Sequence, residues 1–277
     1  MKKSLRTVRV LFALAWFAAL NLVFFGVLAG CGFLVKAQLL PALLGLNAVA
    51  VAAVAAATAL FGRVYCSVVC PMGVFQDVVI RIARKCGRGN AGYRPPRNAL
   101  RWSVFAAAVV AVAVGASSFA GLLDGYSLYG RFAAQLFKPV ASWINNLVAW
   151  ICVEAGHPHV FREEVLVRGM CGLAVAALGL AFIVALAWKG DRVFCNTLCP
   201  TGTLLAALAR KPLVRVRIDA DKCVGCGLCA RVCKANCIDF KNRRVDDARC
   251  VRCFNCLGAC RKDALSYGVG AAACAKS

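Results

Sequence analysis

Long apolar stretches are the feature of this sequence that most restricts its possible folds. A helix that crosses a membrane needs about 20 mostly apolar residues. Four stretches meet this requirement: Val8 to Val35, Leu39 to Phe61, Leu100 to Leu123 and Val165 to Trp188. The hydrophobic content of 61% and the mean hydropathy of +0.72 agree with a membrane protein. We therefore expect four transmembrane helices.

A fifth apolar stretch, from about Phe132 to Val153, is interrupted by Lys138, Pro139, Asn145 and Asn146. We expect it to form an interfacial or re-entrant segment rather than a span.

The amino-terminal stretch partly matches a secretion signal, because MKKSLRTVR is basic and LAGC at 28–31 matches a bacterial lipobox. However, the apolar run before Cys31 is longer than the usual signal core, and the residues after it are apolar. We therefore expect an uncleaved first span.

Basic residues predict the orientation of these spans. The amino terminus and the 62–99 loop are rich in Lys and Arg, whereas the 124–164 region carries Asp124, Glu154, Glu163 and Glu164. Positive loops face the cytoplasm, so we expect both termini and the 62–99 loop to be cytoplasmic in a bacterial inner membrane. The net charge of +22 has the same explanation, since no basic motif interleaved with aromatic residues suggests nucleic-acid binding.

The chain has 18 cysteines, and half of them lie in the polar C-terminal part at ligand spacings. This arrangement indicates a reduced, metal-loaded protein rather than a disulfide framework. We expect a membrane domain over 1–203, a linker over 204–219, an α+β domain over 220–270 and a tail over 271–277.

Two cysteine runs carry the strongest chemical signal. CVGCGLCARVC begins at Cys223, and CVRCFNCLGAC begins at Cys250, 27 residues later. Their spacing, C-x2-C-x2-C-x3-C, is typical of two-cluster bacterial ferredoxins, in which the fourth cysteine of each run ligates the other cluster. Two zinc sites are the rival interpretation, but the doubled run favours two [4Fe-4S] clusters. The predicted ligands are Cys223, Cys226, Cys229 and Cys260 for cluster 1, and Cys233, Cys250, Cys253 and Cys256 for cluster 2.

Three residues depart from or add to this pattern. Lys234 and Arg261 follow the fourth cysteines, where proline is usual, and their charges could favour the reduced clusters. Cys237 is a ninth cysteine in the domain, and it aligns with Ala264 of the second run. Two roles are open for Cys237: a buried, inert thiol, or a ligand of a cluster with altered nuclearity.

A second motif is also duplicated. RVYCSVVCPMG at 63–73 matches RVFCNTLCPTG at 192–202. Each copy follows an even-numbered span, so we expect two pseudo-symmetric helix pairs that bring Cys66, Cys70, Cys195 and Cys199 together. These four could form a metal or cluster site, act as redox-active thiols or a partner contact, or be structural.

Other candidate residues carry weaker signals. His157 and His159 lie in the external loop, and the absence of histidine from the spans argues against bis-histidine haem b. Arg168 and the SLYGR segment at 127–131, next to Asp124, are possible quinone contacts.

The chain resembles the NapH type of iron–sulfur membrane protein, a NapH/MauN-like family that includes the quinol dehydrogenase membrane subunit linked to periplasmic nitrate reductase. The resemblance rests on the four spans, on YCSVVCP and FCNTLCP, and on the runs from Cys223 to Cys260. Similar membrane parts occur in regulators of nitrous oxide reduction, in a methylamine-utilisation protein and in a cytochrome oxidase assembly factor. This chain departs from the nitrate-reductase subunit by lacking both prolines and by its longer external stretch.

The resemblance implies a membrane all-α domain of four helices in two pseudo-repeats, followed by a 2[4Fe-4S] ferredoxin domain. It also implies an electron-transfer subunit of a quinol dehydrogenase. Electrons would pass between the quinol pool and another iron–sulfur protein or a multihaem cytochrome c. The alternative function is copper reduction for the assembly of a respiratory enzyme.

Overall fold

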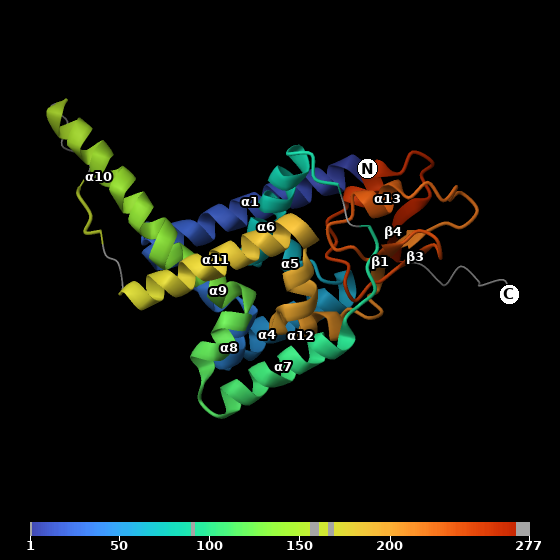
Figure 1. Cartoon of the computed structure of the whole chain (residues 1–277), viewed down its shortest axis with the longest axis horizontal. Helices are drawn as coiled ribbons and strands as arrows, with labels where there is room; N and C mark the ends of the chain where they lie inside the picture. Colours follow the sequence, from blue (N-terminus) through green and yellow to red (C-terminus); the bar gives the residue numbers. More distant parts are fainter. Residues whose placement is uncertain (1, 90–91, 156–160, 166–168, 270–277) are drawn as a thin grey trace.

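A computed structural model describes residues 2–89, 92–155, 161–165 and 169–269. A helical part occupies one end of the elongated molecule, and the cysteine-rich part occupies the other (Figure 1). The helical part contains α1 (Lys2–Phe25), η1 (Ala29–Cys31), α2 (Phe33–Lys36), α3 (Leu39–Leu44), α4 (Ala48–Phe61), α5 (Tyr65–Val68), α6 (Pro71–Lys85), α7 (Asn98–Ala113), α8 (Ser117–Leu123), α9 (Gly125–Phe132), η2 (Ala133–Phe137), α10 (Lys138–Glu154), α11 (Met170–Gly190), η3 (Phe194–Leu198) and α12 (Pro200–Leu208).

Among the described residues, three helical segments are long and apolar enough to cross a membrane: Ser4–Phe25, Gly125–Glu154 and Met170–Gly190. The predicted spans at 39–61 and 100–123 are each divided into shorter helices. The first is interrupted before Asn47, whose side chain accepts a hydrogen bond from the Ala50 N–H and so starts α4 anew. The second is interrupted at Gly115, where φ is +80°.

The apolar stretch at 132–153, which we expected to be interfacial or re-entrant, instead lies within one continuous helix over Gly125–Glu154. A π-helical turn, η2, joins α9 to α10, and Pro139 is the second residue of α10. Such turns change the hydrogen-bond pattern of a helix and often accompany a kink. Figure 1 shows α10 extending away from the other helices, at the end opposite the cysteine-rich part.

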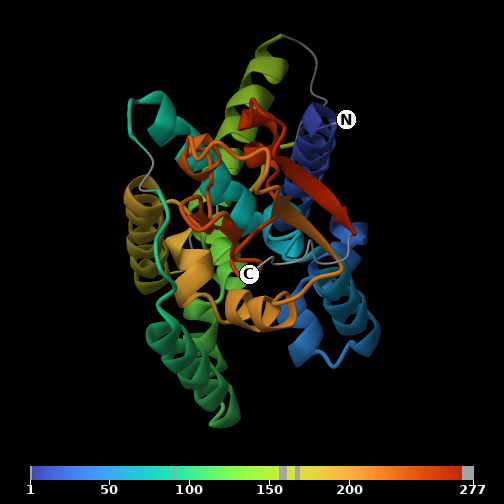
Figure 2. The same cartoon turned by 90° about the vertical axis from the view of Figure 1, so that its right-hand side faces the viewer.

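The cysteine-rich part has two small sheets and two short helices. Its elements are β1 (Val214–Ile218), α13 (Leu228–Arg231), β2 (Ile238–Asp239), β3 (Arg244–Val245), α14 (Asn255–Ala259) and β4 (Leu265–Val269). Strand β1 pairs antiparallel with β4, and β2 pairs with β3. Figure 2 looks onto this end, with the orange and red segments lying over the helices.

The segment at 204–219, which we expected to be a linker, is largely ordered secondary structure. Helix α12 continues to Leu208, and β1 begins at Val214 and pairs with the last strand of the cysteine-rich part. The C-terminal part therefore begins earlier than the sequence suggested.

The two cysteine runs have matching backbones. Gly225 and Gly227 have φ of +70°, and the residues 27 positions later, Arg252 and Phe254, have φ of +54° and +59°. Left-handed φ is uncommon for residues with a side chain. Its recurrence at the same spacing shows that both runs form loops of the same backbone conformation.

Candidate functional site

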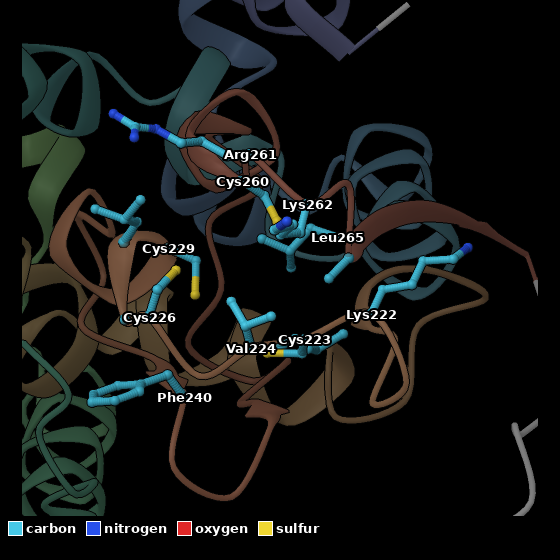
Figure 3. Close-up of a pocket in the computed structure, with 14 residues that line it drawn as sticks. Lys222, Cys223, Val224, Cys226, Cys229, Phe240, Cys260, Arg261, Lys262 and Leu265 are labelled. Carbon is cyan, nitrogen blue, oxygen red and sulfur yellow. The ribbon is translucent and has the colours of Figure 1, made fainter.

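The first cysteine set, Cys223, Cys226, Cys229 and Cys260, lines a single cavity of about 200 Å³. Figure 3 shows Cys226 and Cys229 on one side of this cavity, Cys223 below it and Cys260 above it. Cys226 is exposed and the other three are half-buried. The cavity thus collects four thiols from both runs at the surface of the molecule.

The second cysteine set, Cys233, Cys250, Cys253 and Cys256, is buried. Each member lies near enough to others of the set to interact electrostatically. Cys237 packs against this set, with its Sγ 3.6 Å from that of Cys233. Ala264, its counterpart in the other run, lines the cavity of the first set.

These positions fit iron–sulfur clusters. A [4Fe-4S] cubane needs thiolates spread around a volume large enough for its irons and sulfides, and the first set surrounds a cavity in this way.

The membrane-domain cysteines, Cys66, Cys70, Cys195 and Cys199, are each 5–8% exposed. Cys66 lies in α5 and Cys195 in the π-helical turn η3, whereas Cys70 and Cys199 each precede a helix that begins with proline. The thiols lie near enough for Cys70 and Cys195 to interact electrostatically with other members of the group. The structure therefore brings the two C-x3-CP motifs together.

Each copy of the motif is held by the arginine of the other copy. Arg63 Nη2 donates to the carbonyl oxygen of Cys195 over 2.9 Å, and Arg192 Nη1 donates to that of Cys66 over 2.6 Å. Both arginines are fully buried. Each motif therefore donates an arginine hydrogen bond to a cysteine carbonyl of the other motif.

Both motifs have glycine at the same position, Gly73 and Gly202, for a steric reason. A Cβ on Gly73 would collide with the carbonyl oxygen of Cys66, and a Cβ on Gly202 would collide with that of Cys195. Only glycine allows the start of α6 and of α12 to pack this closely on the preceding turn.

A buried charge cluster connects the membrane domain to the second cysteine set. Asp77 on α6 lies 2.6 Å from Arg9, 2.7 Å from Arg192 and 3.1 Å from Lys234. Burial alone would raise the pKa of Asp77, but the three cations outweigh it and hold that pKa below its usual range. Since Lys234 directly follows Cys233, the cluster reaches the backbone of the second set.

Arg63 differs from Arg192 in its partners. It donates to Asn196 Oδ1 at 2.7 Å and to carbonyl oxygens, and it forms no ion pair with a carboxylate among the described residues. Its Nη2 lies 3.6 Å from the Sγ of Cys66. The buried guanidinium of Arg63 therefore lies directly beside the Cys66 sulfur.

As free thiols, Cys70, Cys195 and Cys199 are poor nucleophiles. Burial raises the pKa of Cys70, of Cys195 and of Cys199. Reactive cysteines have a lowered pKa and are partly exposed. Thiol–disulfide exchange by the free thiols is therefore the least favoured of the three roles considered for them.

Of the remaining candidate residues from the sequence, some lie outside the described residues and others are buried. His157, His159 and Arg168 lie outside the described residues. Within the SLYGR segment, Tyr129 is 1% exposed and donates to Asn21 Oδ1 at 2.8 Å, so it belongs to the packed interior. Asp124 is also buried, and it accepts a hydrogen bond from the hydroxyl of Thr201.

Sequence reasoning missed the roles of Arg63, Arg192 and Asp77. The signal for the arginines was present, because both copies of the duplicated motif begin with Arg-Val. Asp77 was noticeable as a single acid in the basic 62–99 loop, yet its partners come from three separate segments.

Family models match three segments of the chain. One model, described as a 4Fe-4S binding domain, matches residues 43–89 and again 173–219, and each match contains one C-x3-CP motif. A second model with the same description matches residues 216–239, which contain the first cysteine run. The chain therefore carries 4Fe-4S binding domains.

Three relatives were compared with the chain. The methylamine utilization ferredoxin-type proteins MauN of Methylobacillus flagellatus and Paracoccus denitrificans are each 26% identical over 62% of this chain and 48% of their own length. An uncharacterized protein of Methanocaldococcus jannaschii is 40% identical over 22% of this chain and 25% of its own. The chain thus spans about half the length of the MauN relatives or less. No solved structure matches the chain.

The protein is an iron–sulfur, ferredoxin-type protein with apolar helices long enough to cross a membrane. Three of its segments match 4Fe-4S binding models, and part of its length is similar to the methylamine utilization ferredoxin-type proteins MauN.

Proposed function

We propose that the protein transfers electrons between the membrane quinol pool and a partner redox protein through two [4Fe-4S] clusters. The observation that carries this proposal is the arrangement of the cysteine sets from the surface of the molecule to its interior. The first cysteine set lies at the surface, and the second is buried. Lys234, beside the second set, pairs with Asp77, which also pairs with Arg192, and Arg192 donates to the carbonyl oxygen of Cys66. This order suits a relay from membrane to solvent.

The ligands are assigned by position. The first cysteine set would hold cluster 1, and the second would hold cluster 2. Such clusters supply reversible one-electron storage, with a potential set by nearby charge and exposure. The chain contributes the buried charge of Lys234 next to cluster 2 and the half-open cavity around cluster 1.

The exposed cavity is the point of contact for the partner. Lys222, Arg261 and Lys262 line it, and Arg261 extends away from the cavity toward the surface (Figure 3). Basic rims steer acidic partners. An iron–sulfur protein or a multihaem cytochrome c with an acidic face fits this surface.

The proposed location is a bacterial inner membrane, with both termini in the cytoplasm. Helix α1 contacts α14, and Figure 1 places the amino terminus beside the cysteine-rich part. The same end carries the basic 62–99 segment, which favours the cytoplasmic side.

We assign the membrane-domain cysteines as the next site of the relay, holding an iron–sulfur group. Both C-x3-CP motifs fall within matches to a 4Fe-4S binding model. Buried Arg63, which has no carboxylate partner among the residues that the structure describes, lies beside Cys66 and also suits an anionic metal–thiolate group.

Anaerobic purification followed by iron and sulfide analysis tests this proposal. Two [4Fe-4S] clusters give about eight iron atoms per chain, and occupied membrane-domain cysteines give more. Menaquinol should then reduce the clusters, observed by electron paramagnetic resonance. Intact clusters that dithionite reduces but menaquinol does not would contradict the quinol link.

Copper reduction for enzyme assembly is the second candidate, and the four adjacent buried thiols of the membrane domain favour it, because thiolates select Cu(I). Stoichiometric copper that is lost in the Cys66→Ser, Cys195→Ser double variant would support this role. Iron at those cysteines would support the relay instead.

A further inference from the structure

A pocket of about 220 Å³ lies in the membrane part, between α3, α7, α8 and α12. Apart from Asp124 and Thr201, its lining is apolar, and Leu40, Phe105 and Leu204 belong to it. Leu44 and Val109 on its wall are 54% and 51% exposed. Helix α7 is a shorter apolar helix, and these exposed apolar side chains suit a pocket mouth that faces lipid.

The polar end of this pocket is a buried carboxylate. Asp124 is 2% exposed, and it caps α9 by accepting hydrogen bonds from the N–H groups of Tyr126 and Ser127 at 3.0 and 3.1 Å. The hydroxyl of Thr201 donates to its other oxygen. No ion pair between Asp124 and a basic side chain occurs in the described part of the chain. A buried, ionisable group in a membrane domain with no counter-ion is expensive and usually functional.

The carboxylate lies between the pocket and the membrane-domain cysteines. Thr201, its hydrogen-bond donor, is two residues from Cys199 in the second C-x3-CP motif. Thr201 and Pro200, which directly follows Cys199, both line the pocket. The pocket thus connects lipid to the innermost site of the proposed relay.

We propose that this pocket binds the head group of a membrane quinol and that Asp124 accepts its hydroxyl protons; this rests on the proposed function. Oxidation breaks the two O–H bonds of the quinol. Its two electrons reduce the two proposed [4Fe-4S] clusters by one electron each. The two protons pass in turn through the Asp124 carboxylate to solvent, and the product is the quinone.

The chemistry of the pocket favours a quinol over a lipid acyl chain. Both would satisfy the apolar walls, but only a quinol presents an O–H donor to the buried carboxylate. Small-molecule sites commonly combine apolar walls with one or two polar groups that fix orientation.

Photolabelling of the full chain in lipid nanodiscs with a photoreactive quinone analogue tests the site directly. We expect label on peptides of α7 and α12. Val109→Trp fills the pocket and should reduce labelling by about tenfold. The matched control, Val110→Trp, changes a 59% exposed neighbour outside the pocket and should leave labelling within about twofold. Label on other peptides, or equal labelling of the two variants, would contradict quinol binding in this pocket. A tightly held lipid in the pocket that excess quinone cannot displace would contradict it too.

Asp124→Asn tests the proton transfer. Asparagine also caps helices, so the variant should fold and keep its labelling. Quinol-driven reduction of the clusters should fall by about a hundredfold or more, while reduction by dithionite is unchanged. A variant that quinol reduces at the normal rate would overturn the role of Asp124.

The two proposals fail in different ways. If quinol reduces the clusters but neither labelling nor Val109→Trp implicates the pocket, this inference is wrong and the proposed function stands. If the pocket is labelled and Val109→Trp prevents labelling, yet quinol never reduces the clusters, the site binds quinone and the proposed electron transfer is wrong.

Discussion

Individual buried charges determine how the two parts of this protein are joined. Asp77 is shared by Arg9 on α1, by Arg192 at the start of the second motif and by Lys234 beside the second cysteine set. One carboxylate therefore ties together segments that are more than 60 residues apart in sequence. Removing one member of such a group leaves the others buried and uncompensated.

Asp77→Asn is expected to destabilise the protein by about 3–5 kcal/mol. The pKa of Asp77 is lowered, so its contribution is complete above the ordinary carboxyl pKa of about 4. It is lost only as the pH falls through the lower native value. The loss in free energy of unfolding caused by Asp77→Asn should thus be constant between about pH 5 and 7.

Thermal unfolding of the purified wild-type protein and of Asp77→Asn, at about pH 5 and about pH 7, measures this loss of stability. Asp221→Asn, at an exposed carboxyl in the C-terminal part, is the control and should change stability by less than about 0.5 kcal/mol. A deficit that disappears at pH 5 would contradict the lowered pKa.

Lys234→Met should lower the reduction potential of cluster 2. Lys234 is 8% exposed and lies near enough to Cys253 to interact with it electrostatically. Removing a buried positive charge destabilises the reduced cluster, and about 60 mV corresponds to a tenfold change in its one-electron equilibrium. A redox titration followed by electron paramagnetic resonance measures the shift. Lys241→Met removes an exposed, screened charge and should have little effect; equal shifts in both variants would refute the local explanation.

At the scale of elements, helix starts control the geometry of the C-x3-CP motifs. Each motif ends one helical turn, places its second cysteine before the next helix, and begins that helix with proline. Proline suits the first helical position because the N–H there needs no partner. The cysteines four residues apart thus belong to two successive elements rather than to one helix face.

Gly73→Ala should destabilise the protein by about 1–3 kcal/mol, because its Cβ would collide with a backbone carbonyl that cannot move independently. Gly202→Ala should behave alike, since the same contact occurs in the second motif. Gly258→Ala in α14 is the control, because nothing lies within 4 Å of its Cβ. The unfolding midpoints of the three variants measure these effects. A Gly73→Ala variant as stable as the wild-type protein would contradict the close contact between Gly73 and the Cys66 carbonyl oxygen.

Local patterns in the sequence predicted the elements that depend on local chemistry. Apolar runs predicted α1 and α11, and the 27-residue repeat of cysteines predicted two loops that share backbone conformations. The division of the 39–61 and 100–123 stretches, and the continuity of the helix through Pro139, depend on capping and on a π-helical turn. The Asp77 cluster depends on packing between distant segments, which periodicity does not encode.

For the whole molecule, the cysteine-rich part is fixed onto the helical part rather than tethered to it. Arg192 N–H donates to the Lys234 carbonyl at 3.0 Å, Arg63 to that of Ala248 at 3.2 Å, and Arg252 to that of Phe61 at 3.1 Å. This docking buries the second cysteine set and leaves the first at the surface. The two proposed clusters therefore differ in their access to solvent.

An iron chelator should consequently remove cluster 1 before cluster 2. Cys226 is exposed whereas all members of the second set are buried, so we expect a difference in rate of about tenfold or more, because removal of cluster 2 requires local opening of the docked part. Electron paramagnetic resonance of the reduced protein should pass from two interacting clusters to one isolated cluster when about half of the iron has been released. In Cys229→Ser, which removes a ligand of cluster 1, the fast phase should be absent. Simultaneous loss of both clusters, or a fast phase that persists in Cys229→Ser, would contradict the burial order on which the relay depends.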